Sequence, residues 1–256
     1  MSDEYVSLEE ARQLSGLRLV SIRGVPSPWS QAARAILRVK GLDFTLAQQT
    51  PDDPPGLLQE WTGQTSFPVL AFNQEPTRSG WAEILLLAER LSPQPAGIPS
   101  DPAARAAFFG LAHEICGEMG LGWCRRLQSI AAGMQGERPS PVAAYLGPKY
   151  GYSPESAAHA LQRVIEVLTL LRDRLAAQEA TGSRYLMGSD LTALDLYWAT
   201  FCNLVSPLPP DKLPLDDAMR PIFTSTEPEV IALLEGRLLE HRDRIYDEFL
   251  ELPVPL

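Results

Sequence analysis

Short apolar runs and one amphipathic segment mark the first part of the chain. The amphipathic segment, residues 29–41, places Ala33, Ile36 and Leu37 on one face and ends at a glycine, so it predicts a helix. The apolar runs are bounded by glycine, proline or aspartate, as strands are, and cover residues 17–22, 43–49 and 67–72. A short helix, a hairpin turn and a strongly apolar helix complete the order β-α-β-(α)-β-β-α of a small α/β layer, at residues 57–63, 73–76 and 80–91.

The second part of the chain has helical spacing throughout. Asp101 and Pro102 are typical of a helix start, and the helix that they begin is expected to continue to about residue 134 despite its glycines. Thr192 and Asp195 have the spacing of a capping box at the start of a further helix. Ser153 and Pro154 start a further expected helix at residues 155–180, and another covers residues 190–205. Residues 228–252 are expected to form one helix or a pair of helices, and the expected loops cover residues 136–153 and 206–221.

A change in composition separates the two parts. Residues 92–102 contain four prolines and two serines, a composition typical of a linker between domains. We therefore expect an α/β domain followed by an all-helical domain. The expected divisions are an N-terminal arm at 1–16, the α/β domain at 17–92, the linker at 93–102 and the helical domain at 103–256.

Composition and charge exclude several classes of protein. The chain has 256 residues, of which 45% are hydrophobic, so it can bury a sizeable core. Its net charge of −10 disfavours a nucleic acid or an anionic membrane as partner. Three cysteines do not make a disulfide framework and fit a reducing, cytoplasmic setting. The acidic N-terminus lacks the apolar stretch of a signal peptide, and no apolar run is long enough to cross a membrane.

Three motifs in order resemble the cytosolic glutathione transferase superfamily. They are "SPWSQAARAIL" at a strand-to-helix turn, "TSFPVL" before a strand, and "YLMGSDLTALDLYWA" at a helix start. The resemblance implies a serine-type or divergent bacterial-like member with a thioredoxin-like domain followed by a helical bundle. It further implies glutathione as co-substrate, a small electrophilic or hydrophobic second ligand, and a homodimer.

The serine turn is the candidate catalytic site. A helix N-terminus favours an anion such as a thiolate, and a hydroxyl that donates to sulfur lowers the thiol pKa. By the resemblance, Ser27 holds the catalytic position, and Pro28, Trp29 and Ser30 adjoin glutathione. Helix capping is the alternative role for either serine. No cysteine precedes Cys116, which excludes thiol–disulfide exchange at this turn.

The rest of the glutathione site departs from the family pattern. The resemblance implies a cis peptide bond between Phe67 and Pro68, with the Phe67 backbone binding the cysteinyl part of glutathione as an added strand would. The family's Glu-Ser pair, which holds the γ-glutamyl end, is replaced by Ser79 and Gly80, or by Arg78 and Ser79 in a shifted alignment. The acid is missing in both alignments. Glu83, one turn later, could substitute for it, and Ser79 could instead be a helix cap.

Two hypotheses of different class follow. In the first, the chain is an enzyme that activates the glutathione thiolate for attack on an electrophile or for isomerisation, with His113, Glu114 and Trp123 in the acceptor pocket. In the second, it is a non-catalytic binding or interaction protein whose γ-glutamyl site has diverged. No metal is expected, because His113 and Cys116 share a helix face without two further ligands at motif spacing.

Overall fold

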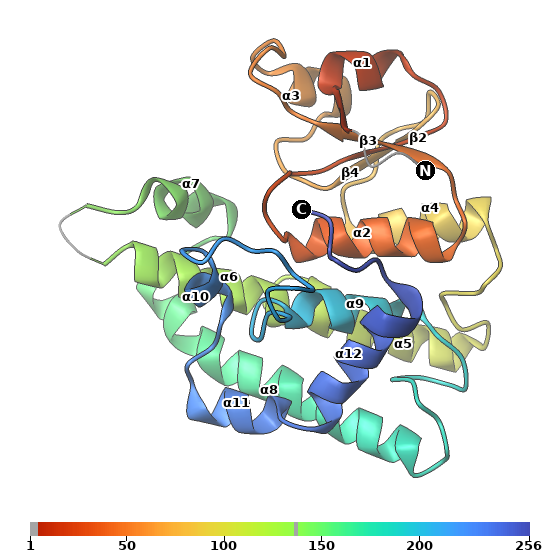
Figure 1. The fold of residues 1–256 in the computed structure, drawn as a ribbon, viewed down its shortest axis with the longest axis vertical. Coiled ribbons are helices and arrows are strands. Elements are labelled where there is room, and N and C mark those ends of the chain that lie inside the picture. The colour runs from red at the N-terminus through yellow and green to blue at the C-terminus, as the bar shows by residue number, and fades with distance from the viewer. Residues whose placement is uncertain (1–4, 136–137) are drawn as a thin grey trace.

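A four-stranded sheet forms the centre of the N-terminal domain. The computed structural model describes residues 5–135 and 138–256, so parts of the expected arm and of the expected loop at 136–153 lie outside the described residues. The sheet has the order β1-β3-β2-β4, in which only β4 is antiparallel to its neighbour (Figure 1). The strands are β1 (Tyr5–Ser7), β2 (Leu17–Val20), β3 (Phe44–Gln48) and β4 (Val69–Phe72).

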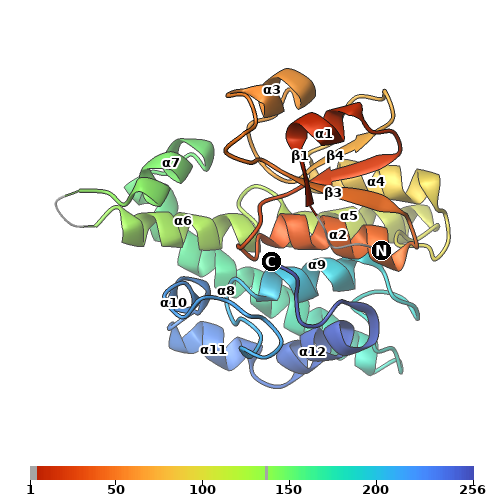
Figure 2. The same cartoon turned by 45° about the horizontal axis from the view of Figure 1, so that its top comes forward.

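Helices cover both faces of the sheet, as in thioredoxin-like domains. Along β2, Leu19 lies opposite Leu46 and Leu70, and all three pack against the helices that face the second domain. Val20 points the other way, into a separate apolar cluster. The inner helices are α2 (Pro28–Val39) and α4 (Trp81–Leu91); the outer helices are α1 (Leu8–Gln13) and α3 (Leu57–Thr62). Figure 2 shows α2 between the sheet and the helical domain.

Residues 5–13 differ from the expected arm. Tyr5–Ser7 pair in parallel with β3, and Leu8 and Ala11 of α1 are fully buried. The Asp53 carboxylate accepts hydrogen bonds from the Glu9 backbone N–H at 3.1 Å and from the Thr50 hydroxyl at 2.9 Å, which fixes the start of α1. The strand has three residues and the helix six, so neither is long enough to show a hydrophobic period in the sequence. The described part of residues 1–16 therefore belongs to the sheet and its outer layer.

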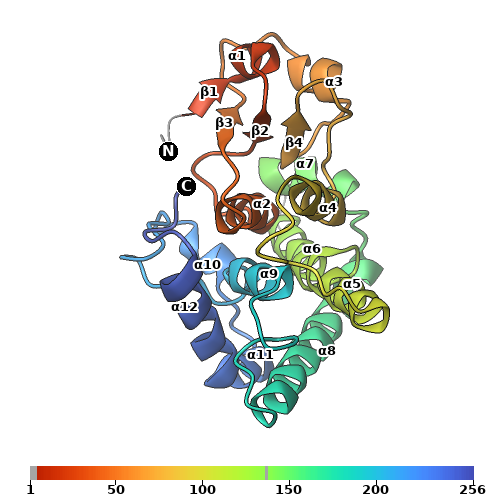
Figure 3. The ribbon, with the colours of Figure 1, turned by 90° about the vertical axis from the view of Figure 1, so that its right-hand side faces the viewer.

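The second domain is all-helical, with α9 (Ala193–Cys202) at its centre. Every residue of α9 is buried, and the helix lies beside α2, α5 and α12 (Figure 3). Within the described part of the chain, no helix has the length and apolar character of a membrane span. The other helices are α5 (Pro102–Cys116), α6 (Leu121–Gly133), α7 (Pro141–Lys149), α8 (Pro154–Glu179), α10 (Arg220–Phe223), α11 (Pro228–Leu234) and α12 (Arg237–Phe249).

Two expectations for this domain are corrected. The helix expected from 103 to 134 is two helices, because Met119 has a φ of +57° and a Cβ at Gly120 would lie 2.7 Å from the His113 carbonyl oxygen. The expected loop at 136–153 contains α7, which begins with Ser140 accepting from the Ala143 N–H at 3.2 Å.

The capping box at the start of α9 is present in a modified form. The Asp195 carboxylate accepts from both the backbone N–H and the hydroxyl of Thr192, at 3.0 Å each. The same carboxylate lies 3.0 Å from His241 Nε2 of α12. Asp195 is therefore a buried junction between α9 and α12 as well as a cap.

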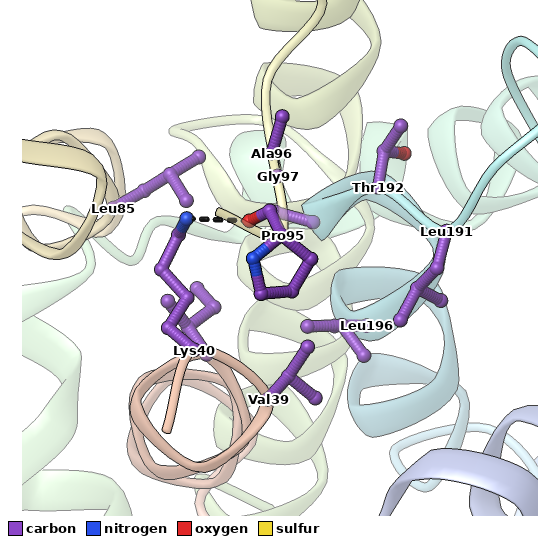
Figure 4. Close-up of a pocket in the computed structure, with 11 residues that line it drawn as sticks. Val39, Lys40, Leu85, Pro95, Ala96, Gly97, Leu191, Thr192 and Leu196 are labelled. Carbon is purple, nitrogen blue, oxygen red and sulfur yellow. Dashed lines mark hydrogen bonds between the residues drawn. The ribbon is translucent and has the colours of Figure 1, made fainter. Parts of the chain in front are cut away.

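A buried lysine holds the linker between the domains. The Lys40 ammonium donates to the carbonyl oxygens of Ser92 and Pro95, at 2.7 Å each, and lies 2.7 Å from a Glu89 carboxylate oxygen. Figure 4 shows this ammonium directed at the Pro95 carbonyl. Lys40 and Pro95 both line a small cavity between α2, α4 and the linker. The linker thus has a fixed path, which fixes how the two domains meet.

Candidate functional site

Ser27 lies at the start of α2 with its hydroxyl unused. It is the N-cap residue by position, and Pro28 is the first residue of the helix. Its side chain makes no capping hydrogen bond and none to any other described residue. The residue is only 9% exposed. The alternative role for Ser27, a side-chain cap, is therefore not fulfilled, and the hydroxyl is free to donate to a ligand beside the positive end of the helix dipole.

Ser30 follows one turn into the same helix. It is 5% exposed, and its hydroxyl oxygen is buried without a hydrogen-bond partner among the described residues. Buried hydroxyls are normally paired, so an unpaired one beside a free serine marks a place that a ligand or a water completes.

The loop before β4 borders this turn. The Phe67–Pro68 peptide bond is cis. In the described residues neither the N–H nor the carbonyl oxygen of Phe67 is hydrogen-bonded. Pro68 lines a small cavity together with Trp29, Ser79 and Trp81. The structure thus brings Trp29, Pro68 and Ser79, three of the sequence-derived candidates, to one place.

The start of α4 contains no free acid. Gly80, not Ser79, is the N-cap, and its N–H donates to a Glu83 carboxylate oxygen at 3.1 Å. Arg78 bridges to Leu70 through its backbone and pairs with Glu75 at 2.7 Å through its side chain. Its charge is therefore already matched. The two carboxylates nearest to Ser79 in sequence are both engaged: that of Glu75 pairs with Arg78 and Arg90, and that of Glu83 accepts from the Gly80 N–H.

An aromatic wall extends from the serine turn into the helical domain. The Trp29 indole N–H donates to the Cys116 carbonyl oxygen at 2.9 Å, which fixes the ring. Its ring centroid lies 4.9 Å from that of Phe201 and 6.3 Å from that of Tyr150. Trp123 continues the wall, 4.7 Å from Tyr150. Burial raises the pKa of Tyr150, so this phenol stays neutral.

His113 and Glu114 do not join this wall. His113 is exposed in the last turn of α5, and Glu114 forms an ion pair with Arg163 of α8. Neither makes a hydrogen bond or a ring contact with Trp29 or Trp123 in the described residues. Of the three expected acceptor-pocket residues, the structure associates only Trp123 with the site.

Lys149 and Phe201 are missing from the sequence-derived set of site residues. Lys149, the last residue of α7, donates to the Thr65 carbonyl oxygen at 2.8 Å and to the Ser66 hydroxyl at 3.0 Å. These contacts join residues more than 80 positions apart in the chain. No local pattern could have indicated them.

The cysteines have no part in the site. All three are buried and free of disulfides, and burial raises the pKa of Cys124 and of Cys202 to about 11. The described residues contain no group of three or more histidine, cysteine, aspartate or glutamate side chains that could hold a metal.

Comparisons with known proteins identify the N-terminal domain and the fold. Residues 25–96 match the family model of the glutathione S-transferase N-terminal domain. A rice glutathione transferase in complex with glutathione is 20% identical, with a TM-score of 0.58 over 94% of each chain. One from Methylobacterium radiotolerans in complex with glutathione sulfonate is 18% identical, with a TM-score of 0.55 over 91% of this chain and 92% of that chain. No curated protein sequence matches the chain.

The solved structures share the fold along nearly the whole chain, and the family model covers the region that contains Ser27 and Pro68. Residues 25–96 thus match the family's N-terminal domain, and the chain as a whole shares the fold of solved glutathione transferases.

Proposed function

We propose that the protein binds glutathione between the start of α2 and the loop at Phe67 and activates its thiol. The observation that carries this proposal is the free hydroxyl of Ser27, which lies at a helix N-terminus and makes no hydrogen bond of its own. The unpaired Phe67 backbone supports it, because its N–H and carbonyl can pair with the cysteinyl residue of the tripeptide. That several solved relatives contain glutathione is consistent with this placement.

The chemistry that follows is thiolate transfer to an electrophile. The thiol proton passes to solvent, and the Ser27 hydroxyl and the α2 dipole stabilise the sulfur anion that remains. A sulfur lone pair then forms a bond to the electrophilic carbon, and the leaving group departs with its bonding electron pair. The site contributes position and charge stabilisation.

A second candidate is a binding or interaction protein without transferase activity. It is favoured by the start of α4, where Ser79 and Gly80 stand in place of the family's Glu-Ser pair. The Glu83 carboxylate is already engaged by the N-terminus of the helix. In this case the α-ammonium group of glutathione has no free carboxylate partner there. The loss of that ion pair would weaken the affinity for glutathione.

Isothermal titration with glutathione separates the two candidates. The transferase proposal expects saturable binding at millimolar glutathione or below, and it expects glutathione to bind more tightly than cysteinylglycine, which lacks the γ-glutamyl group. If glutathione binds, Ser27→Ala should raise the pKa of its bound thiol. Ser189→Ala is the matched control, because Ser189 is exposed and bonds only to Asp190 in the described residues. The absence of binding at millimolar glutathione would rule out the transferase and leave the binding protein.

A further inference from the structure

We propose that the second substrate of this site is an aromatic electrophile that carries a carboxylate group and its own leaving group, with the ring against the aromatic wall and the carboxylate on Lys149. The wall consists of Trp29, Phe201, Tyr150 and Trp123, as defined by the ring contacts above. The inference rests on the proposed function for the identity of the first substrate. The binding of the acid itself follows from the wall and the lysine alone.

The contacts around Lys149 connect α7 with the loop before β4 and with Trp29, at the place where the two domains meet. Its ammonium bonds to Ser66, which precedes Phe67 and Pro68 in the chain. Pro68 and Trp29 line one cavity. Trp29 contacts Tyr150, and Tyr150 directly follows Lys149. Lys149 therefore lies on the side of the site where the loop before β4 and the aromatic wall come together.

Lys149 differs in its pairing from the other lysines. The chain has three, of which Lys40 pairs with Glu89 and Lys212 pairs with Asp247. Lys149 has no carboxylate partner among the described residues; its acceptors are a carbonyl and two hydroxyls, all neutral. In a protein with a net charge of −10, a partly exposed cation with only neutral acceptors attracts an anion. Exchanging a neutral acceptor for a carboxylate strengthens the hydrogen bond.

The neighbouring side chains favour a planar ligand. The Lys149 ammonium lies 4.4 Å from the ring centroid of Tyr145, which is itself 60% exposed. Trp29 and Trp123 are half-buried, so part of each ring is open to solvent. Aromatic rings prefer offset or edge contacts with other rings, and tilted pairs such as Trp123 and Tyr150 offer both. A flat ring with an acidic substituent matches both the wall and the cation.

The alternative is that Lys149 is only a clamp between α7 and the loop at 65–66. A clamp holds the wall in place for every ligand, whether charged or neutral. An anion site, in contrast, distinguishes two ligands that differ in charge alone. The two roles therefore predict different results for a carboxylic acid and its ester.

The experiment measures quenching of tryptophan fluorescence by nitrobenzoate and by its methyl ester, without glutathione. The wild-type protein is expected to bind the acid more tightly than the ester by about fivefold, the size of one partly exposed ion pair. Lys149→Met should abolish that preference and leave the affinity for the ester unchanged. Lys149→Arg should keep the preference, and Lys212→Met is the matched control that should behave as the wild type.

Each other outcome overturns the inference. An acid that binds no better than the ester, or neither probe binding, removes the anion site. A Lys149→Met protein that keeps the preference places the cation elsewhere. Equal weakening of both probes shows a clamp. Because these titrations contain no glutathione, their failure is separate from a failure of the glutathione titration, which concerns the proposed function.

Discussion

Lys40 gives the sharpest stability prediction, because its ammonium is buried and fully used. Its side chain is 3% exposed and that of Glu89 is 18% exposed. Lys40→Met keeps the apolar stem but leaves the carboxylate and two linker carbonyls without their donor. Breaking a buried ion pair costs about 3–5 kcal/mol. In Lys40→Met the Glu89 carboxylate stays partly exposed to solvent and still accepts a hydrogen bond from the Gly97 N–H at 2.8 Å. We therefore expect the lower end of this range, a loss of about 3 kcal/mol in the free energy of unfolding.

Urea unfolding followed by tryptophan fluorescence measures this loss. Adding Glu89→Gln to Lys40→Met removes the uncompensated charge, so the double variant should lose less than the sum of the two single variants by about 1 kcal/mol or more. Lys212→Met, which breaks an exposed pair with Asp247, should leave the unfolding midpoint near that of the wild type. A loss below about 1 kcal/mol for Lys40→Met, with no coupling to Glu89, would refute the reasoning.

Three further predictions test other parts of the structure. Gly122→Ala should cost about 1–3 kcal/mol in thermal or urea unfolding, because its Cβ would lie 2.5 Å from the Phe201 ring; a neutral effect would contradict the packing of the aromatic wall. Burial raises the pKa of Cys202 to about 11, so only about one in a thousand of its thiols is ionised at pH 8. Iodoacetamide should therefore label Cys202 only after unfolding. Rapid labelling of the native protein, detected by mass spectrometry, would contradict this prediction. Burial alone would raise the pKa of Asp53, but the hydrogen bonds that its carboxylate accepts, chiefly from Thr50, outweigh burial and lower this pKa. Ionised Asp53 therefore stabilises the fold above its unfolded pKa of about 3.9, and this stabilisation is lost as the pH falls below that value. Asp53→Asn should therefore destabilise at pH 7 and matter less in acid, as urea titrations at both pH values would reveal; an equal loss at both would contradict this.

The sequence predicts those parts of the site that depend on local chemistry. A serine before a proline and a helical pattern is enough to place Ser27 at the start of α2. Strands β2, β3 and β4 and the helical second domain follow from hydrophobic spacing and from the resemblance. Strand β1 does not, and the strand expected after the hairpin turn at 73–76 is reduced to an isolated bridge between Leu70 and Arg78. What Ser27 does with its hydroxyl does not follow, because capping and ligand binding need the same residue at the same position.

The parts that the sequence does not predict depend on contacts across the fold. Helix α7 contains Gly147 and Pro148, which are typical of a loop, and it is held by packing on α6. Gly147 packs closely there, because a Cβ would lie 3.0 Å from the Met134 methyl group and would require that methyl group to shift. The pairing of Lys149 with Ser66 depends in turn on where α7 lies. The acceptor side of the site is therefore visible only in three dimensions.

The most direct test of the account is the pKa of the glutathione thiol when it is bound to the protein, measured from thiolate absorbance against pH. In the wild type, the pKa of the bound glutathione thiol is expected to lie below the cysteine reference of about 8.5. A rise toward that reference is expected in Ser27→Ala, with Ser189→Ala unchanged. A bound thiol whose pKa is the same in the wild type and in Ser27→Ala would contradict the central claim that the free Ser27 hydroxyl activates sulfur.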